Sequence, residues 1–212
     1  MSRVVFVSGW AGYPELFPRL SALVEFVTPF SDGSEAEVLE NLRQGGEVLM
    51  AWSTGAHLVL KHRGELFARW RRVVLLSPFM NFCVHVPRAT VQRMRDTILA
   101  EGPERTVRAF WRNCAAPRIA FSHGDDTRVL AAGLDYLLES CAIITPGESG
   151  ANVRIVHGAD DAIVPASAGS DVAALLAGSW RSLMAFGHYP SETILLGILY
   201  EETGRDAFQP GW

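Results

Sequence analysis

The chain has 212 residues, of which 49% are apolar and 20% are charged, and it carries a net charge of −4. This length allows one domain with a sizeable core, and the composition excludes a disordered or fibrous chain. The negative charge gives no general electrostatic reason to bind nucleic acid. No apolar stretch approaches the ~18 residues of a membrane span, so no membrane partner is expected.

The three cysteines, Cys83, Cys114 and Cys141, are widely spaced and form no Cys-x-x-Cys pair. They predict neither a disulfide framework nor a zinc site, and they fit a reducing compartment. The apolar run at residues 4–7 is too short for the core of a signal peptide. We therefore expect a cytoplasmic protein that holds no metal.

The first half of the chain alternates predicted strands with predicted helices. Predicted strands lie at 3–7, at 23–27, from Val48 onward and at 71–76, and the apolar runs within them, such as 4–7 and 73–76, are typical of parallel strands that are covered on both faces. Helical stretches separate them at 14–22, 34–43 and 56–62, and Ser34 and Glu37 have the spacing of a capping box. This alternation predicts an α/β fold with a largely parallel sheet.

The pattern changes after residue 78. Helical periodicity covers 90–100, 104–113 and 126–140 with no convincing strand between them, which predicts a helical cap over the carboxyl edge of the sheet. Strands then return at 152–156 and near 182–186, each followed by a helix, near 166–177 and 191–202. The predicted organisation is an α/β core of residues 1–78 and 151–212, interrupted by a cap of residues 79–150.

Ser53 lies where the apolar run from Val48 meets the helix at 56–62, between the small residues Ala51 and Gly55. This is the layout of a nucleophile elbow, in which a tight turn from strand to helix exposes the serine hydroxyl. Small flanking residues are needed because a side chain there would strike the neighbouring strand or helix. An ordinary loop serine fits the same pattern, so the interpretation depends on a base and an acid elsewhere.

Two later segments supply a base and an acid. Asp161 follows the predicted strand at 152–156, and His188 follows the strand near 182–186. The carboxyl ends of parallel strands meet at one edge of a sheet, so Ser53, Asp161 and His188 are expected to lie together. Serine needs such a base, and the base an orienting acid. The order serine, acid, histidine is that of α/β-hydrolases.

Other residues compete with Asp161 and His188 for their roles. Asp160 competes with its neighbour for the role of the acid. His57 is closest to the serine in sequence, but it is expected on a helix face that points away from the hydroxyl. His157 stands at a strand end, where a packed or hydrogen-bonded role is expected, whereas His85 and His123 could line the cap.

With these residues in place, the chain resembles the α/β-hydrolase superfamily and, more narrowly, the pimeloyl-acyl-carrier-protein methyl ester esterases of biotin synthesis. Residues 8–12, 52–55, 76–78, 104–110 and 133–137 carry this resemblance. Ser8 stands where the family usually has histidine, and Ala51 where it has glycine. The first predicted strand corresponds to the third strand of the usual sheet, as in a truncated group of these esterases.

The resemblance implies a mechanism as well as a fold. Ser53 would be the nucleophile, His188 the general base and Asp161 the residue that orients the histidine. The backbone N–H groups of Trp10 and Thr54 would form the oxyanion hole. No metal or organic cofactor is implied.

The resemblance also implies a substrate, the methyl ester of pimeloyl-acyl carrier protein. Acyl carrier proteins are acidic, and positive charge in the cap could dock them, although arginines that simply face water would give the same spacing. The candidate docking residues are Arg105, Arg108 and Arg112, with Arg93 and Arg95 nearby. The candidate acyl-channel residues are Phe79, Phe110 and Trp111, with Phe82, unless these aromatic residues form a small core within the cap. A monomer is expected.

Two other functions stay open at this point. A general carboxylesterase or thioesterase that acts on small acyl substrates would use the same three residues without a carrier protein. A non-catalytic ligand receptor on a hydrolase scaffold is a further alternative, because such a receptor can keep all three residues.

Overall fold

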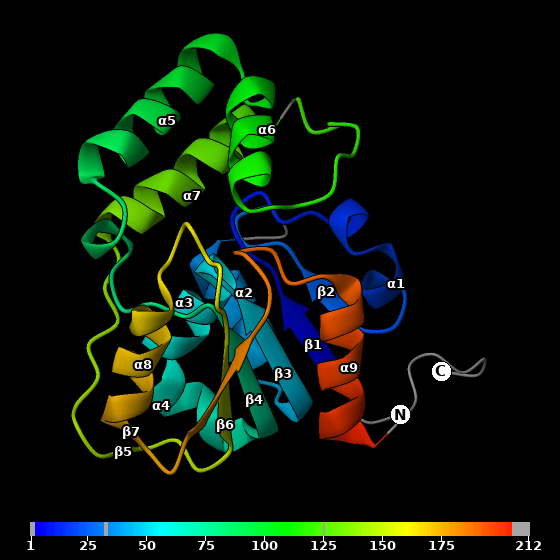
Figure 1. The fold of residues 1–212 in the computed structure, drawn as a ribbon, viewed down its shortest axis with the longest axis vertical. Coiled ribbons are helices and arrows are strands. Elements are labelled where there is room, and N and C mark those ends of the chain that lie inside the picture. Colours follow the sequence, from blue (N-terminus) through cyan, green and yellow to red (C-terminus); the bar gives the residue numbers. More distant parts are fainter. Residues whose placement is uncertain (1–2, 32–33, 125, 205–212) are drawn as a thin grey trace.

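A six-stranded, fully parallel sheet forms the centre of the computed structural model, which describes residues 3–31, 34–124 and 126–204 (Figure 1). Its strand order is β2-β1-β3-β4-β6-β8. The strands are β1 (Val4–Val7), β2 (Glu25–Val27), β3 (Gly46–Trp52), β4 (Trp70–Leu76), β6 (Val153–Gly158) and β8 (Trp180–Met184). The predicted α/β fold with a parallel sheet is confirmed.

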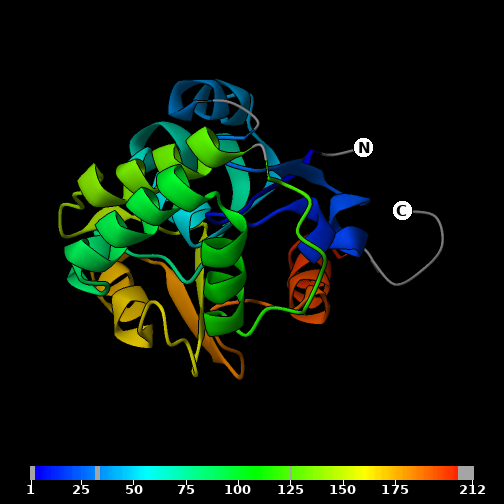
Figure 2. The ribbon, with the colours of Figure 1, turned by 90° about the horizontal axis from the view of Figure 1, so that it is seen from above.

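Helices cover both faces of this sheet (Figures 1 and 2). Successive strand residues point to opposite faces, so Phe6 and Met50 pack in one core cluster while Val5 and Leu49 pack in the other. The first cluster includes residues of α1 (Pro18–Ser21) and α9 (Glu192–Thr203). The second includes residues of α2 (Glu35–Leu42), α3 (Thr54–Lys61), α4 (Arg63–Leu66) and α8 (Ala166–Leu175). Burial on both faces explains why the strands read as continuous apolar runs.

Three helices lie together beyond one end of the sheet: α5 (Arg88–Glu101), α6 (Glu104–Asn113) and α7 (Thr127–Glu139) (Figure 1). They fall within the predicted cap. The following segment returns along the core, where Ala142 and Ile144 join the second cluster and the N–H of Ala142 donates to the Met80 carbonyl oxygen at 2.8 Å. Across the described ranges, no helix combines the length and apolarity required to cross a bilayer.

Three predictions of individual elements are wrong. The stretch at 14–22 is a 3₁₀ turn, η1 (Pro14–Leu16), and a separate α1, because the residue before Pro18 is driven out of helical geometry. The helix predicted at 166–177 ends at Leu175, and β7 (Leu176–Ala177) pairs with β5 (Glu148–Ser149), a strand missed in the region predicted to be helical. The last strand lies at 180–184 instead of 182–186. Two further 3₁₀ turns are η2 (Phe67–Arg69) and η3 (Phe82–Val84).

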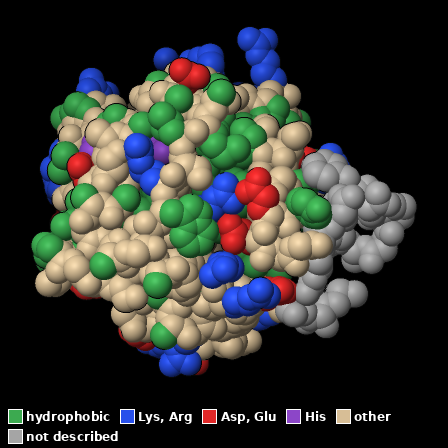
Figure 3. All heavy atoms as spheres, turned by 60° about the horizontal axis from the view of Figure 1, so that its bottom comes forward, with side chains coloured by type: hydrophobic (Ala, Val, Ile, Leu, Met, Phe, Trp, Pro, Cys, Tyr) green, Lys and Arg blue, Asp and Glu red, His purple; other side chains and the backbone are tan. Residues whose placement is uncertain are grey.

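The face that Figure 3 shows, with the bottom of Figure 1 turned forward, mixes acidic and basic side chains. Blue and red groups alternate over it, and no large area of one sign stands out.

Candidate active site

Ser53 occupies the turn between β3 and α3 and has φ 53° and ψ −114°. A non-glycine residue rarely adopts this positive φ, and such strain persists only where the surroundings hold it. Two backbone hydrogen bonds do so: the N–H of Ser53 donates to the Leu76 carbonyl oxygen, and its carbonyl oxygen accepts from the N–H of His57, both at 2.9 Å. The side chain is thereby lifted off the end of β3.

Gly55 lets α3 start directly behind this turn. A Cβ at position 55 would lie 2.4 Å from the carbonyl oxygens of both Val7 and Ser8. No rotation of a side chain could relieve that contact because the opposing atoms are backbone. The requirement for a small residue here, expected from the motif, therefore has a specific cause in the approach of α3 to β1.

His188 lies between Ser53 and Asp161. Its Nε2 is 2.8 Å from the Ser53 Oγ, and its Nδ1 is 2.8 Å from the Asp161 Oδ2. His188 comes from the loop between β8 and α9, and Asp161 from the loop between β6 and α8. The Asp161 carboxylate can only accept a hydrogen bond, so the ring proton of neutral His188 lies on Nδ1. The other ring nitrogen, Nε2, is then free to accept the proton of the serine hydroxyl.

Asp161 is the most heavily hydrogen-bonded member of the group. Its Oδ1 accepts from the N–H groups of Ile163 and Val164, both at 2.9 Å, and its Oδ2 accepts from the Ser77 Oγ at 2.9 Å. Burial would raise the pKa of Asp161, but hydrogen bonds from the two histidines 157 and 188 and from Val164 outweigh it and hold the pKa well below its usual range. The carboxylate therefore stays ionised beside the histidine.

The competing residues have other partners. Asp160 is exposed, and its N–H donates to the Phe186 carbonyl oxygen. His157 is fully buried; its Nε2–H donates to the Val164 carbonyl oxygen at 2.9 Å and lies 3.5 Å from the Asp161 Oδ2. His157 is therefore a buried support of the acid loop, in line with the packed role expected for it.

The predicted oxyanion groups lie next to Ser53. Thr54 is the first residue of α3, so its N–H belongs to the unpaired first turn of that helix. The N–H of Trp10 donates to the Thr54 Oγ1 at 3.3 Å, and the Trp10 indole N–H donates to the Leu130 carbonyl oxygen at 2.9 Å. Ser8, at the position of the family's usual histidine, is fully buried, and its Oγ has no hydrogen-bond partner among the described residues.

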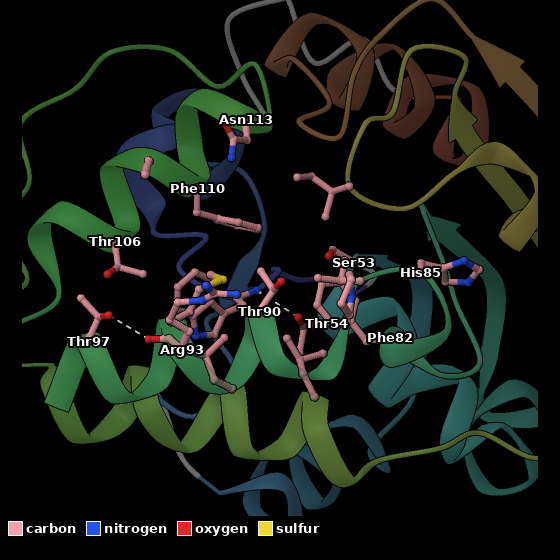
Figure 4. Close-up of a pocket in the computed structure, with 18 of the residues that line it drawn as sticks. Ser53, Thr54, Phe82, His85, Thr90, Arg93, Thr97, Thr106, Phe110 and Asn113 are labelled. Carbon is pink, nitrogen blue, oxygen red and sulfur yellow. Dashed lines mark hydrogen bonds between the residues drawn. The ribbon is translucent and has the colours of Figure 1, made fainter.

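A cavity of about 610 Å³ opens above Ser53, between the core and the cap (Figure 4). Helices α5 and α6 form opposite walls, and residues of α7 close it from behind. The apolar part of the lining includes Phe82, Met94, Phe110, Leu134, Leu137 and Ile163. The polar part includes His85, Thr90, Arg93, Thr97, Glu101, Arg105, Thr106 and Asn113, and Figure 4 shows Thr97 and Thr106 at the end away from Ser53. The cavity can therefore hold an extended molecule with one apolar and one polar part.

Two of the four predicted channel aromatics, Phe82 and Phe110, line this cavity. The Phe110 ring packs edge-on against Trp10 with centroids 4.9 Å apart. Phe79 is instead fully buried against the His57 ring. Trp111 is also buried, with its indole N–H donating to the Ala11 carbonyl oxygen at 2.8 Å. These two predictions are corrected: both rings serve the packing of the core and the cap.

The three predicted docking arginines lie on α6 and are exposed. Arg105 also lines the cavity and pairs with Glu101, the last residue of α5, at 3.5 Å. Arg108 pairs with Glu104 at 2.8 Å. Arg112 is in the last turn of the helix. Each local pair offsets part of the positive charge that the sequence places on this helix.

The remaining histidines divide between the cavity and the protein interior. His85 lines the cavity, and burial lowers its pKa below the usual 6.5. His123 does not line it; its ring stacks on Tyr13 with centroids 3.5 Å apart. His57 is buried, with Nδ1–H donating to the Phe79 carbonyl oxygen and Nε2 accepting from the Ser140 hydroxyl. Burial lowers its pKa to about 4, which keeps the ring neutral.

Sequence reasoning missed two residues at this site. Ser77 was noted as part of a family motif, but no role was assigned to it. A signal existed, because a polar residue at the end of β4 must face the loop after its neighbour β6. Arg93 was grouped with the docking arginines, and nothing in its spacing distinguished a side chain inside the cavity from one on the outside.

Comparisons of the sequence found no matching family model and no matching curated protein. In the described ranges, no group of three or more His, Cys, Asp or Glu residues could hold a metal ion.

Solved structures do match the fold. A hydrolase from Pseudomonas aeruginosa PA01 matches with a TM-score of 0.64 at 17% identity, covering 96% of this chain and 90% of the other. A thermophilic esterase from Thermogutta terrifontis gives 0.63 at 17%, covering 98% and 90%. RedJ, a thioesterase of the prodiginine pathway in Streptomyces coelicolor, gives 0.57 at 19%, covering 94% and 85%. The chain therefore has the α/β-hydrolase fold.

Proposed function

We propose that this chain is a serine hydrolase of carboxylic esters, with Ser53 as nucleophile, His188 as general base and Asp161 as the orienting acid. The observation that carries the proposal is the unbroken pair of 2.8 Å contacts from the Ser53 Oγ through His188 to Asp161. The strained turn at Ser53 and the cavity above it support the same function. Matching solved structures described as esterases and a thioesterase are consistent with it.

In this mechanism the Ser53 Oγ attacks the ester carbonyl carbon while His188 Nε2 takes the hydroxyl proton. The negative charge on the carbonyl oxygen is held by the N–H of Thr54 and by the N–H of Trp10, whose weak 3.3 Å hydrogen bond to the Thr54 hydroxyl is given up for the new acceptor. His188 then gives its proton to the departing alcohol. Water, activated by the same histidine, releases the acid from the acyl-enzyme. Asp161 stabilises the charged histidine throughout.

The proposed physiological substrate is the methyl ester of pimeloyl-acyl carrier protein. The sequence resemblance suggests it, and exposed Arg105, Arg108 and Arg112 on α6 support docking of an acidic carrier beside the cavity mouth. The second candidate is a carboxylesterase or thioesterase of small acyl substrates. The pairing of Arg105 with Glu101 of α5 and of Arg108 with Glu104 of α6 favours it, because it weakens the charge offered to a carrier.

The test is cleavage of the pimeloyl-carrier methyl ester and of a short p-nitrophenyl ester. We expect Ser53→Ala to lower kcat by roughly 10⁴-fold or more for both. Arg105→Glu/Arg108→Glu should lower kcat/KM about tenfold at low salt for the carrier-bound ester alone. Arg71→Glu/Arg181→Glu is the matched control, since both arginines are exposed on the core.

The outcomes of this test distinguish the candidate functions. Full turnover by Ser53→Ala would refute the proposed mechanism. Cleavage of the small ester only, with no effect of the arginine variant, would favour the second candidate. Wild-type protein that cleaves neither ester and whose Ser53 is not labelled by a fluorophosphonate would favour a non-catalytic receptor.

A further inference from the structure

Two arginines line the cavity, Arg93 and Arg105, and Arg93 is the one without an ion pair among the described residues. It lines the cavity, and Figure 4 shows it on the α5 wall across from Phe110. Within the described ranges, the structure gives its guanidinium neither an ion pair nor a hydrogen-bond partner. Arg105, the other arginine of the lining, is paired with Glu101.

The acidic groups nearest to Arg93 on the packed helices are already engaged. Asp96, one turn along α5, pairs with Arg95 at 2.9 Å, and so does Asp135 of α7 at 2.8 Å. Burial lowers the pKa of His85 on the same lining, so that ring is neutral at pH 7. Arg93 is exposed at the cavity lining, and Glu101, the acidic residue of that lining, is paired with Arg105, so the Arg93 charge is available to a ligand in the cavity.

Arg93 lies on α5, in the same cavity as the nucleophile Ser53. Thr90 lies one turn nearer the serine on the same helix, about 4.5 Å along the axis, and Figure 4 shows it between Arg93 and Thr54. The cavity that contains both Arg93 and Ser53 also has apolar lining residues, among them Phe82, Phe110 and Leu137. A chain of methylene groups can lie along these residues and present an anionic group to the arginine.

We propose that Arg93 selects substrates that carry an anionic group beyond an apolar segment next to the ester. The planar guanidinium is suited to a carboxylate or a phosphate, which it can bind through two hydrogen bonds. Two sources share this chemistry: a carboxylate at the far end of the acyl chain, and the phosphate of a pantetheine arm. The inference rests on the proposed hydrolase function and adds the substrate class of its cavity.

Two matched pairs of esters test it. Monomethyl and dimethyl pimelate differ by one free carboxylate, and the methyl pimeloyl thioesters of 4′-phosphopantetheine and pantetheine differ by one phosphate. We expect wild-type kcat/KM to favour the anionic member of at least one pair about tenfold. Arg93→Met should bring this ratio close to one, and Arg93→Lys should restore part of it. The pair that responds identifies the source of the anion.

Arg128→Met provides the control, because it removes the same charge from an exposed position on α7 that does not line the cavity. It should keep the wild-type ratios. If neither pair shows a preference that depends on Arg93, the inference is overturned while ester hydrolysis stands.

Binding separates this inference from the proposed reaction. Calorimetry on Ser53→Ala protein, with and without Arg93→Met, measures the affinity for the same four esters without turnover. If the wild type cleaves no ester but the anionic ligands still bind about tenfold more tightly through Arg93, the reaction is wrong and the anion site holds. Equal affinities in both proteins would overturn the anion site.

Discussion

At the scale of single residues, the site depends on side chains whose freedom has been removed. Ser53 is held at φ 53° by backbone hydrogen bonds, a conformation that costs on the order of 1–3 kcal/mol. Ser77, at φ 46°, is likewise in the left-handed region and places its hydroxyl on Asp161. Both strained residues follow the ends of neighbouring strands, β3 and β4. The strain therefore lies where it fixes the nucleophile and the acid.

The choice of acid leads to a first prediction. Asp161→Asn keeps the shape of the side chain but removes its charge and offers a donor to His188, which favours the wrong histidine tautomer. We expect kcat to fall by roughly 10³–10⁴-fold with little change in KM. Asp160→Asn is the matched control, since the neighbouring side chain is exposed and makes no contact with the histidine; its kcat should stay within about twofold. An equal loss of kcat in both variants would show that activity depends on the conformation of the loop and not on the Asp161 carboxylate.

At the scale of elements, strands that are buried on both faces could be predicted from the sequence. Strands that depend on contacts between distant segments could not. The strands in the middle of the sheet, such as β3 and β4, are covered on both faces and were visible as apolar runs. Edge strand β8 has exposed Trp180 and Leu183, so its pattern lacked that signal and its position was displaced. The short pair β5 and β7 exists only through contact between distant segments.

The same distinction applies to the candidate site. Ser53, Asp161 and His188 could be proposed because each follows a strand, and the structure brings them into contact; their catalytic role is still a prediction. Ser77 and Arg93 could not be assigned, because one depends on the pairing of β4 with β6 and the other on which side of α5 faces the cavity. Phe79 and Trp111 were placed in the cavity wrongly, since an aromatic side chain in a helical region fits a core or a channel equally well.

The junction of β3 and α3 gives a prediction at the scale of elements. Gly55→Ala should lower the free energy of unfolding by about 1–3 kcal/mol, because the new methyl group meets two backbone oxygens at 2.4 Å. Gly64→Ala in α4 is the control, because a Cβ there meets nothing within 4 Å; it should raise stability by about 0.5–1 kcal/mol. Urea denaturation of both variants measures the difference. Stability of Gly55→Ala at or above that of the wild type would contradict the close approach of α3 to β1.

At the scale of the whole molecule, the Glu35 carboxylate contacts side chains of both the core and the cap. Glu35 of α2 lies 2.8 Å from both the Lys61 Nζ and the His62 Nε2, and it accepts from the Tyr136 hydroxyl of α7 at 3.3 Å. The Lys61 ammonium also lies over the Tyr136 ring, 5.0 Å from its centroid. Leu134 and other residues of α7 form part of the cavity wall. The hydrogen bond from Tyr136 to the Glu35 carboxylate therefore helps to hold that wall against the core.

This arrangement predicts how stability depends on pH. The hydrogen bond from His62, against the effect of burial and with help from Lys61, lowers the pKa of Glu35 from 4.5 to about 2. Folding therefore favours the ionised form, so its contribution is fully present above pH 4.5 and is lost as the pH falls towards 2. We expect Glu35→Gln to be less stable than the wild type by about 1–3 kcal/mol at pH 7. The gap should close as the pH falls from about 4.5 towards 2.

Urea denaturation of both proteins between pH 7 and pH 3 measures this gap. Glu40→Gln is the control on the same helix, since Glu40 forms only an exposed pair with Arg43 and its loss should cost less than about 1 kcal/mol. A gap between Glu35→Gln and the wild type that widens as the pH falls below about 4.5 would mean that folding disfavours the ionised carboxylate. The attraction of Lys61 and His62 would then not offset its burial, and Glu35 could not be the charged link between α7 and the core.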